Sequence, residues 1–153
     1  VVIEDIFWLE KLKDGFEQFD ILGLAGASDV NIKSPAMWHL MSNRDNWSGA
    51  VNHEVPNQPD KVFATNFGIA PQRCLIMDGL LLAMKKSRLI EKGVMFNPKF
   101  KFHHYDLDFC LQANNAGLLM STIPLHVSHA SGGESANSDA WRESEKLFLS
   151  IYG

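Results

Sequence analysis

The segment from Cys74 to Gly133 constrains the fold most, because it sets strand-like and helix-like stretches in a fixed order. An apolar run over Leu75–Met84 predicts a buried strand, and Asp78 and Gly79 lie inside it. Three further elements are predicted: a helix between an N-cap at Ser87 and a C-terminal glycine at Gly93, a helix over Asp106–Ala116, and a strand over Leu118–Val127. Strands that alternate with helices predict an α/β fold, with a layered mixed sheet flanked by helices.

The rest of the chain adds elements at both ends of this segment. Large apolar residues at spacings of three and four predict an amphipathic helix over Glu4–Phe19, and the apolar run that follows predicts a buried strand over Ile21–Ala25. The polar stretch from Ser28 to Lys61 shows no sustained hydrophobic period, so it is expected to be a long irregular excursion with a hairpin. Such long irregular segments are often functional, and this one is a candidate cover for a binding site. A last helix is expected over Asp139–Tyr152, with Ser138 as its cap.

Composition and charge limit the function classes. The chain has 153 residues, 46% of them hydrophobic, which suits one compact domain over residues 1–153. A net charge of -4 argues against nucleic-acid partners, which leave a basic footprint. The longest apolar run is too short to span a membrane. Cys74 and Cys110 lack a CxxC spacing and are expected to be buried free thiols, which favours a reducing cytoplasm.

Three acidic residues and one histidine are candidates for chemistry. Asp106 and Asp108 fall in the first turn of a predicted helix, where the free amides and the helix dipole favour a carboxylate; a simple helix cap is the plainer interpretation. Asp78 would be costly to bury in an apolar strand without a partner, so it is expected to face a ligand or to bond a backbone amide. His129 ends a strand before a small-residue loop, with His126 as a competing candidate ligand.

The order of these motifs resembles the acceptor-side half of a family 2 glycosyltransferase. The resemblance is carried by Asp78-Gly79, the LLLAMKKSRLIEKG step, the YDLDFCLQANNAG segment and the final VSHASGG. It implies part of a GT-A nucleotide-diphospho-sugar transferase fold. The family's nucleotide-binding half and its metal-binding acids would then lie before Val1, so the chain is interpreted as a fragment with little or no transferase activity alone.

The same resemblance implies roles for particular residues. Asp106 matches the second acid of the family's acidic pair and would be the general base, but Tyr105 stands in place of the first acid, so Asp108 is a helper or an alternative base. Asp78 and Gly79 would contact the acceptor. His129 would bind a divalent metal, Mn²⁺ or Mg²⁺, in a site that this chain cannot complete.

The implied function is transfer of a sugar, with inversion, from a nucleotide-diphosphate sugar to a glycan or another hydroxyl acceptor. An alternative stays open: a non-catalytic carbohydrate-binding or partner-interaction module on the same fold. Membrane association of a longer parent protein is also left open. His103 and His104 lie in a loop with Lys99 and Lys101, which would suit a diphosphate, but exposed loop residues are the default expectation.

Overall fold

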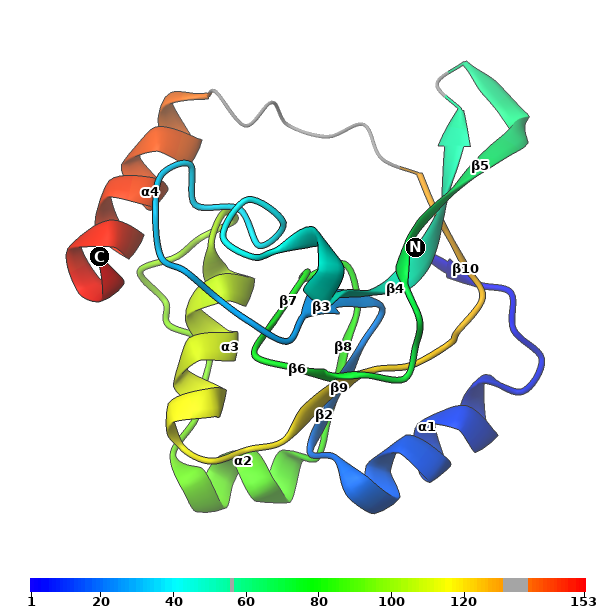
Figure 1. The fold of residues 1–153 in the computed structure, drawn as a ribbon, viewed down its shortest axis with the longest axis horizontal. Helices are drawn as coiled ribbons and strands as arrows, with labels where there is room; N and C mark the ends of the chain where they lie inside the picture. The colour runs from blue at the N-terminus through cyan, green and yellow to red at the C-terminus, as the bar shows by residue number, and fades with distance from the viewer. Residues whose placement is uncertain (56, 131–137) are drawn as a thin grey trace.

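The computed structural model describes residues 1–55, 57–130 and 138–153, and these form a mixed α/β protein (Figure 1). Their helices are α1 (Trp8–Gln18), α2 (Lys86–Lys92), α3 (Tyr105–Asn115) and α4 (Asp139–Tyr152), with a short 3-10 helix, η1 (Arg44–Asn46). Their strands are β1 (Val2–Ile3), β2 (Ile21–Gly23), β3 (Ala25–Ala27), β4 (Trp47–Val55), β5 (Gln58–Gly68), β6 (Arg73–Cys74), β7 (Ile76–Met77), β8 (Leu82–Met84), β9 (Met120–Thr122) and β10 (Val127–His129).

The strands form two mixed sheets. One has the order β1-β10-β4-β3-β7, with β5 paired to the other side of β4, and the second has the order β6-β9-β2-β8. In each sheet one pair is parallel, β10 with β4 and β2 with β9, and the others are antiparallel. The prediction of an α/β fold with mixed strands is therefore confirmed at this level, with two sheets where one was expected.

Three predicted strands are divided in the structure. The stretch Ile21–Ala25 separates into β2 and β3, and Leu75–Met84 separates into β7 and β8 around a turn. The stretch Leu118–Val127 is likewise divided into β9 and β10, with Pro124 between them, where its missing amide cannot join a ladder. In all three cases the apolar run crosses from one sheet to the other. A continuous apolar run therefore predicts that the segment is buried, but it does not predict that the segment forms a single strand.

The helices follow the sequence more closely. α4 begins where Ser138 accepts a hydrogen bond from the amide of Trp141, and α2 ends at Gly93, which has a φ of 65°. The predicted N-cap at Ser87 is wrong, because Lys85 holds that position without a side-chain bond. α1 begins later than predicted, at Trp8, after a turn in which the amide of Phe7 donates a 2.9 Å hydrogen bond to the carboxylate of Asp5. The hairpin expected in the excursion is β4–β5, and Figure 1 shows it extending away from the body.

The core lies between the two sheets and α3. Its fully buried side chains include Ile21 and Leu22 from β2, Met77 from β7 and Phe109 from α3. Both cysteines are buried and free, as expected. Phe148 of α4 is also fully buried, which fixes the last helix against the start of α3. The core therefore holds the turn after β7 and the beginning of α3 next to each other.

Candidate functional site

The turn after β7 carries Asp78, whose carboxylate is fixed on both oxygens. Its Oδ1 accepts a 2.9 Å hydrogen bond from the amide of Leu80, and its Oδ2 accepts a 3.0 Å bond from the indole Nε1 of Trp38. Its backbone amide donates to the carbonyl of Ala25 in β3. Asp78 is thus in a turn between sheets, with one partner from the excursion, and not inside a strand as predicted.

Gly79 joins this turn to the beginning of α3. Its amide donates a 2.8 Å hydrogen bond to Oδ2 of Asp106, and its carbonyl accepts one of 3.1 Å from the hydroxyl of Tyr105. A Cβ at this position would lie 2.5 Å from the Tyr105 hydroxyl and 2.8 Å from Cβ of Asp106. Only glycine therefore allows the turn to approach α3 so closely. The structure brings Asp78, Gly79 and Asp106 together.

Asp106 has an unusual electrostatic environment. Burial and, second, the nearby charge of Asp78 raise its pKa to about 6, against the effect of backbone amides that favour the carboxylate. Among these amides, those of Gly79 and Leu107 lie 2.8 and 2.9 Å from the two carboxylate oxygens. At pH 7 such a group is mostly ionised, with roughly a tenth protonated. It can accept a proton at neutral pH and release it again.

The two carboxylates lie in a pocket of about 270 Å³ with largely aromatic walls. Its aromatic and imidazole side chains are Trp38, His39, Phe102, His103, His104, Tyr105 and Trp141. Trp38 also packs edge-on against the rings of Trp47 and Phe67, which holds its indole in place above Asp78. Flat apolar rings can pack against the C–H face of a sugar ring, and carboxylates beside them can accept hydrogen bonds from its hydroxyls. The lining of this pocket therefore suits a sugar ring.

His104 is a structural part of this pocket and not an exposed loop residue as expected. Its exposed fraction is 5%, and its ring packs between Trp141 and Phe148 of α4. Its Nδ1 lies 2.9 Å from the hydroxyl of Ser144, which itself donates to the carbonyl of His103. Burial lowers the pKa of His104 to about 4, so the ring is neutral at pH 7.

Asp108 lies away from the pocket. Its exposed fraction is 1%, and its carboxylate accepts hydrogen bonds from Gln112 at 2.6 Å and from the hydroxyl of Tyr152 at 2.8 Å. It does not line the pocket that contains Asp106. Asp108 thus lies at the contact between α3 and α4, because a first-turn residue two positions on faces another side of the helix, and its part in catalysis stays a prediction.

His129 ends β10 beside His53 of β4. The two residues are partners in the parallel register, and their ring centroids lie 5.9 Å apart. Burial, followed by the charge of His53, lowers the pKa of His129, so its imidazole is neutral at pH 7 and able to bind a metal. His126, the competing candidate, is exposed and lies 3.7 Å from Glu4. The glycines of the small-residue loop lie outside the described residues.

No group of three or more His, Cys, Asp or Glu side chains suited to a metal occurs within residues 1–55, 57–130 and 138–153. Within the described residues, His129 and His53 bring two imidazole rings together at this place. A metal bound here would need further ligands beyond the described ones.

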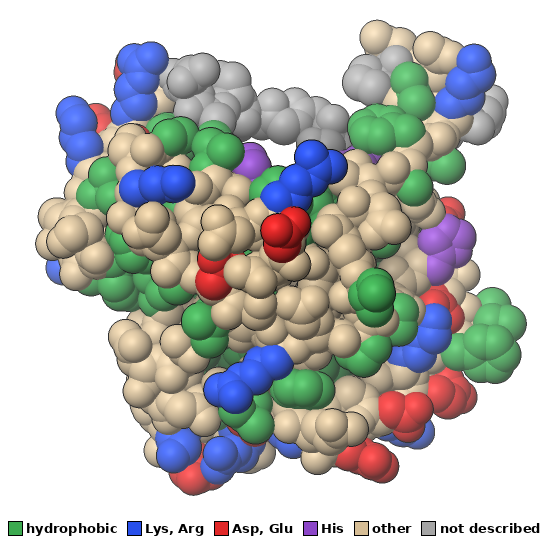
Figure 2. Space-filling model, in the orientation of Figure 1, with side chains coloured by type: hydrophobic (Ala, Val, Ile, Leu, Met, Phe, Trp, Pro, Cys, Tyr) green, Lys and Arg blue, Asp and Glu red, His purple; other side chains and the backbone are tan. Residues whose placement is uncertain are grey.

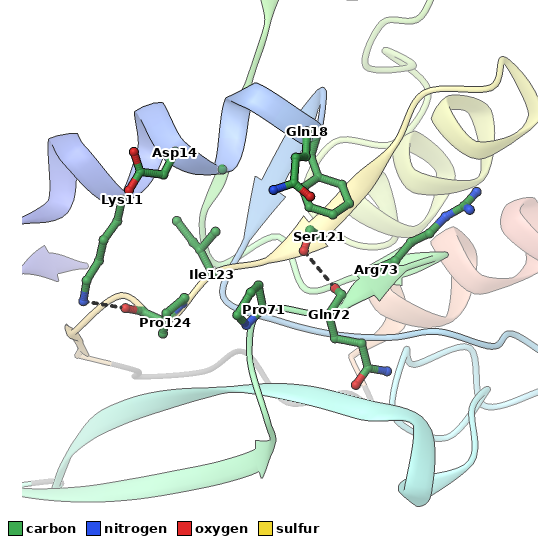
Figure 3. A pocket seen from close by; sticks show the side chains of 11 residues that line it. Lys11, Asp14, Gln18, Pro71, Gln72, Arg73, Ser121, Ile123 and Pro124 are labelled. Atoms are coloured by element: carbon green, nitrogen blue, oxygen red, sulfur yellow. Dashed lines mark hydrogen bonds between the residues drawn. The ribbon is translucent and has the colours of Figure 1, made fainter.

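A larger pocket, of about 420 Å³, lies between α1 and the segment that leads into β6 (Figure 3). Two hydrogen bonds join residues of its lining: Lys11 donates to the carbonyl of Pro124 at 2.8 Å, and Ser121 donates to the carbonyl of Gln72 at 3.0 Å. It shares no residue with the pocket around Asp106. Size alone therefore does not identify the site.

Sequence reasoning missed the part that Trp38 plays. The sequence around the aromatics of the excursion predicts packing for them, and only the long irregular stretch itself signals a cover for a site. A comparison with protein-family models and with curated proteins finds no match for the chain. No described helix is long and apolar enough to cross a membrane.

Proposed function

We propose that this chain is the acceptor-side part of an inverting glycosyltransferase of the GT-A type. The observation that carries the proposal is the pairing of Asp106 with Asp78 in one aromatic pocket, where burial and mutual repulsion raise the pKa of Asp106 to about 6. A carboxylate with that pKa is a suitable general base near neutral pH. The sequence resemblance points to the same residue.

In the proposed reaction, Asp106 accepts the proton of an acceptor hydroxyl. The hydroxyl oxygen bonds to the anomeric carbon of the donor sugar as the bond from that carbon to the diphosphate breaks, and a nucleoside diphosphate leaves with the electron pair. The amides of Gly79 and Leu107 fix the two oxygens of Asp106 and leave lone pairs for the hydroxyl. Asp78 orients the acceptor through a second hydroxyl, while Trp38 holds Asp78.

The proposal includes a divalent ion, Mn²⁺ or Mg²⁺, which when bound would neutralise charge on the departing diphosphate. His129 fits one position, because it is a neutral imidazole next to a second histidine, and Mn²⁺ accepts nitrogen ligands. Oxygen ligands would come from elsewhere in the protein.

The experiment is a turnover assay on the full-length protein. A panel of nucleotide sugars is supplied with Mn²⁺, and released nucleoside diphosphate is measured for wild type, Asp106→Asn and Asp108→Asn. We expect turnover to fall by about 10³-fold or more in Asp106→Asn. Asp108→Asn should lose stability and keep turnover per folded molecule. Equal turnover in Asp106→Asn and wild type would overturn the proposal.

The second candidate is a non-catalytic carbohydrate-binding module. The aromatic walls of the pocket favour it independently, since they would hold a sugar whether or not a donor binds. The same assay separates the two, together with titration of glycans into this chain. Glycan binding that depends on Trp38, with no release of nucleoside diphosphate from any donor, would favour the module.

A further inference from the structure

The charges of this chain are unevenly distributed. Figure 2 shows acidic side chains gathered over α1 and basic side chains gathered over α2. Between residues 85 and 101 there is a single acidic residue, Glu91, and there are six basic ones: Lys85, Lys86, Arg88, Lys92, Lys99 and Lys101. The segment is therefore strongly positive in a chain whose net charge is -4. At physiological salt, exposed charges farther apart than a Debye length of about 8 Å are largely screened from one another. The positive segment therefore attracts a partner largely independently of the acidic residues elsewhere in the chain.

Most of these cations are free to meet a partner. Asp20 engages Arg88 at 3.1 Å and lies 4.0 Å from Lys85, and Glu91 engages Arg88 as well. Within the part of the chain that the structure describes, Lys86, Lys92, Lys99 and Lys101 make no ion pair, and all four are exposed.

Large apolar side chains stand outward among the same cations. Ile90 of α2 is 70% exposed, and Met95 and Phe102 in the segment from α2 to α3 are 67% and 64% exposed. Figure 1 shows that this segment runs from α2 along α3 toward α4. Ile151 of α4 is also exposed and lines one shallow hollow together with Met95. The basic face, defined as α2 and residues 93–102, thus combines free lysines with exposed apolar groups.

We propose that the basic face docks this protein onto the surface of an anionic lipid bilayer. Lysines attract anionic headgroups, and isolated apolar side chains enter the boundary between headgroups and acyl chains. An acidic protein would explain the lysines, but it would not require Ile90, Met95 and Phe102 to stand exposed. Phe102 also lines the pocket of Asp106, so docking would set the mouth of that pocket close to the membrane.

The test is flotation of the chain with lipid vesicles. Vesicles of phosphatidylcholine mixed with phosphatidylglycerol are compared with vesicles of phosphatidylcholine alone, at low and at high salt. We expect binding to the anionic vesicles only, weakened by salt. The variant Lys92→Gln/Lys99→Gln/Lys101→Gln should bind about tenfold more weakly or worse. The matched control, Lys13→Gln/Lys33→Gln/Lys61→Gln, removes the same charge from exposed positions elsewhere and should bind like wild type.

A second variant, Ile90→Ser/Met95→Ser, tests the apolar contribution. It keeps every charge, and both side chains are exposed, so the fold should not change. We expect weaker binding that salt reduces as before. Absence of vesicle binding would overturn the proposal and favour an acidic protein partner instead. Equal binding by the basic-face variant and its control would overturn it too, because the attraction would then not reside in this face.

Discussion

Oδ2 of Asp106 accepts a 2.8 Å hydrogen bond from the amide of Gly79, although 27 positions separate the two residues in the chain. This bond connects the first turn of α3 to the turn after β7, and the Tyr105 hydroxyl makes a second bond to the carbonyl of the same glycine. The arrangement places a carboxylate of raised pKa beside Asp78, and no ion pair to Asp106 occurs among the described residues. The backbone amide and carbonyl of Gly79 both bond side chains at the start of α3, and these two bonds determine the position of the candidate base.

The close approach at Gly79 predicts a large effect for Gly79→Ala. The new methyl group would overlap the Tyr105 hydroxyl and Cβ of Asp106, so the turn and α3 must separate. We expect the free energy of unfolding to fall by about 2–3 kcal/mol, measured by urea denaturation. Gly93→Ala is the contrasting variant, since its methyl group meets no atom within 4 Å and its cost, about 1 kcal/mol, comes from the left-handed backbone. Equal or smaller loss in Gly79→Ala would contradict this account.

Much of the helical structure was predictable because its signals are local. Ser138 before α4 and Gly93 after α2 act through bonds within one turn, which the sequence shows directly. The divisions at Leu24 and at the turn of Asp78 were not predictable, because each depends on which sheet receives the following residues. Apolar composition is the same in either sheet.

In the candidate site, too, features set by nearby residues could be predicted from the sequence, and features set by distant segments could not. Asp78, Gly79 and Asp106 could be proposed from motif order, but the bond from Trp38 to Asp78 depends on the path of an irregular excursion. His104 is buried because α4, some forty residues later, packs over it. No pattern around His104 itself reports that contact.

Asp106 predicts a fall in stability as pH rises. Its pKa is raised in the folded protein, so between the ordinary value, near 4, and about 6 the folded state holds a proton that the unfolded state has lost. Stability from this group is present at low pH and is lost as pH rises through 6, by at most about 3 kcal/mol. Urea denaturation of wild type and Asp106→Asn at several pH values should show this slope in wild type only. The same slope in both would assign it to another group.

The pKa itself can be measured by carbon NMR of the Asp106 carboxyl group during a pH titration. Removal of the neighbouring charge in Asp78→Asn should bring the midpoint down from about 6, because Asp78 is the second cause of the shift after burial. An unchanged midpoint would mean that burial alone sets the pKa.

His104 predicts the opposite dependence on pH. Its pKa is lowered to about 4 by burial, so between 4 and the ordinary value of 6.5 the unfolded state holds a proton that the folded state lacks. Stability from this group is present above 6.5 and is lost as pH falls toward 4. The variant His104→Asn suits the left-handed backbone at this position, where φ is 59°, and should remove the slope. It should also lower stability at pH 7, since the ring contacts with Trp141 and Phe148 are lost. A slope that survives the substitution would contradict the assignment.

Glu145 of α4 anchors the excursion that carries Trp38. Its Oε1 accepts hydrogen bonds from the hydroxyl of Ser34 at 3.0 Å and from the amide of Ala36 at 2.7 Å. We expect Glu145→Ala to free this stretch and so to loosen the contact between Trp38 and Asp78. Hydrogen exchange of the Ala36 amide, followed by NMR, should accelerate by about tenfold or more, as expected for a lost bond to a charged acceptor.

The control for this variant is Glu143→Ala, which removes an exposed acid from the same helix and so the same charge. It should leave the exchange of Ala36 unchanged. If exchange were equally fast in both variants, general loosening of α4 would be the cause, and no specific anchor would exist. If Ala36 exchanged at the wild-type rate in Glu145→Ala, the stretch around Ala36 would be held without this anchor, by the packing of Trp38 against Trp47 and Phe67. Comparison of Glu145→Ala with Glu143→Ala therefore distinguishes a specific anchor at Glu145 from a general loss of stability in α4.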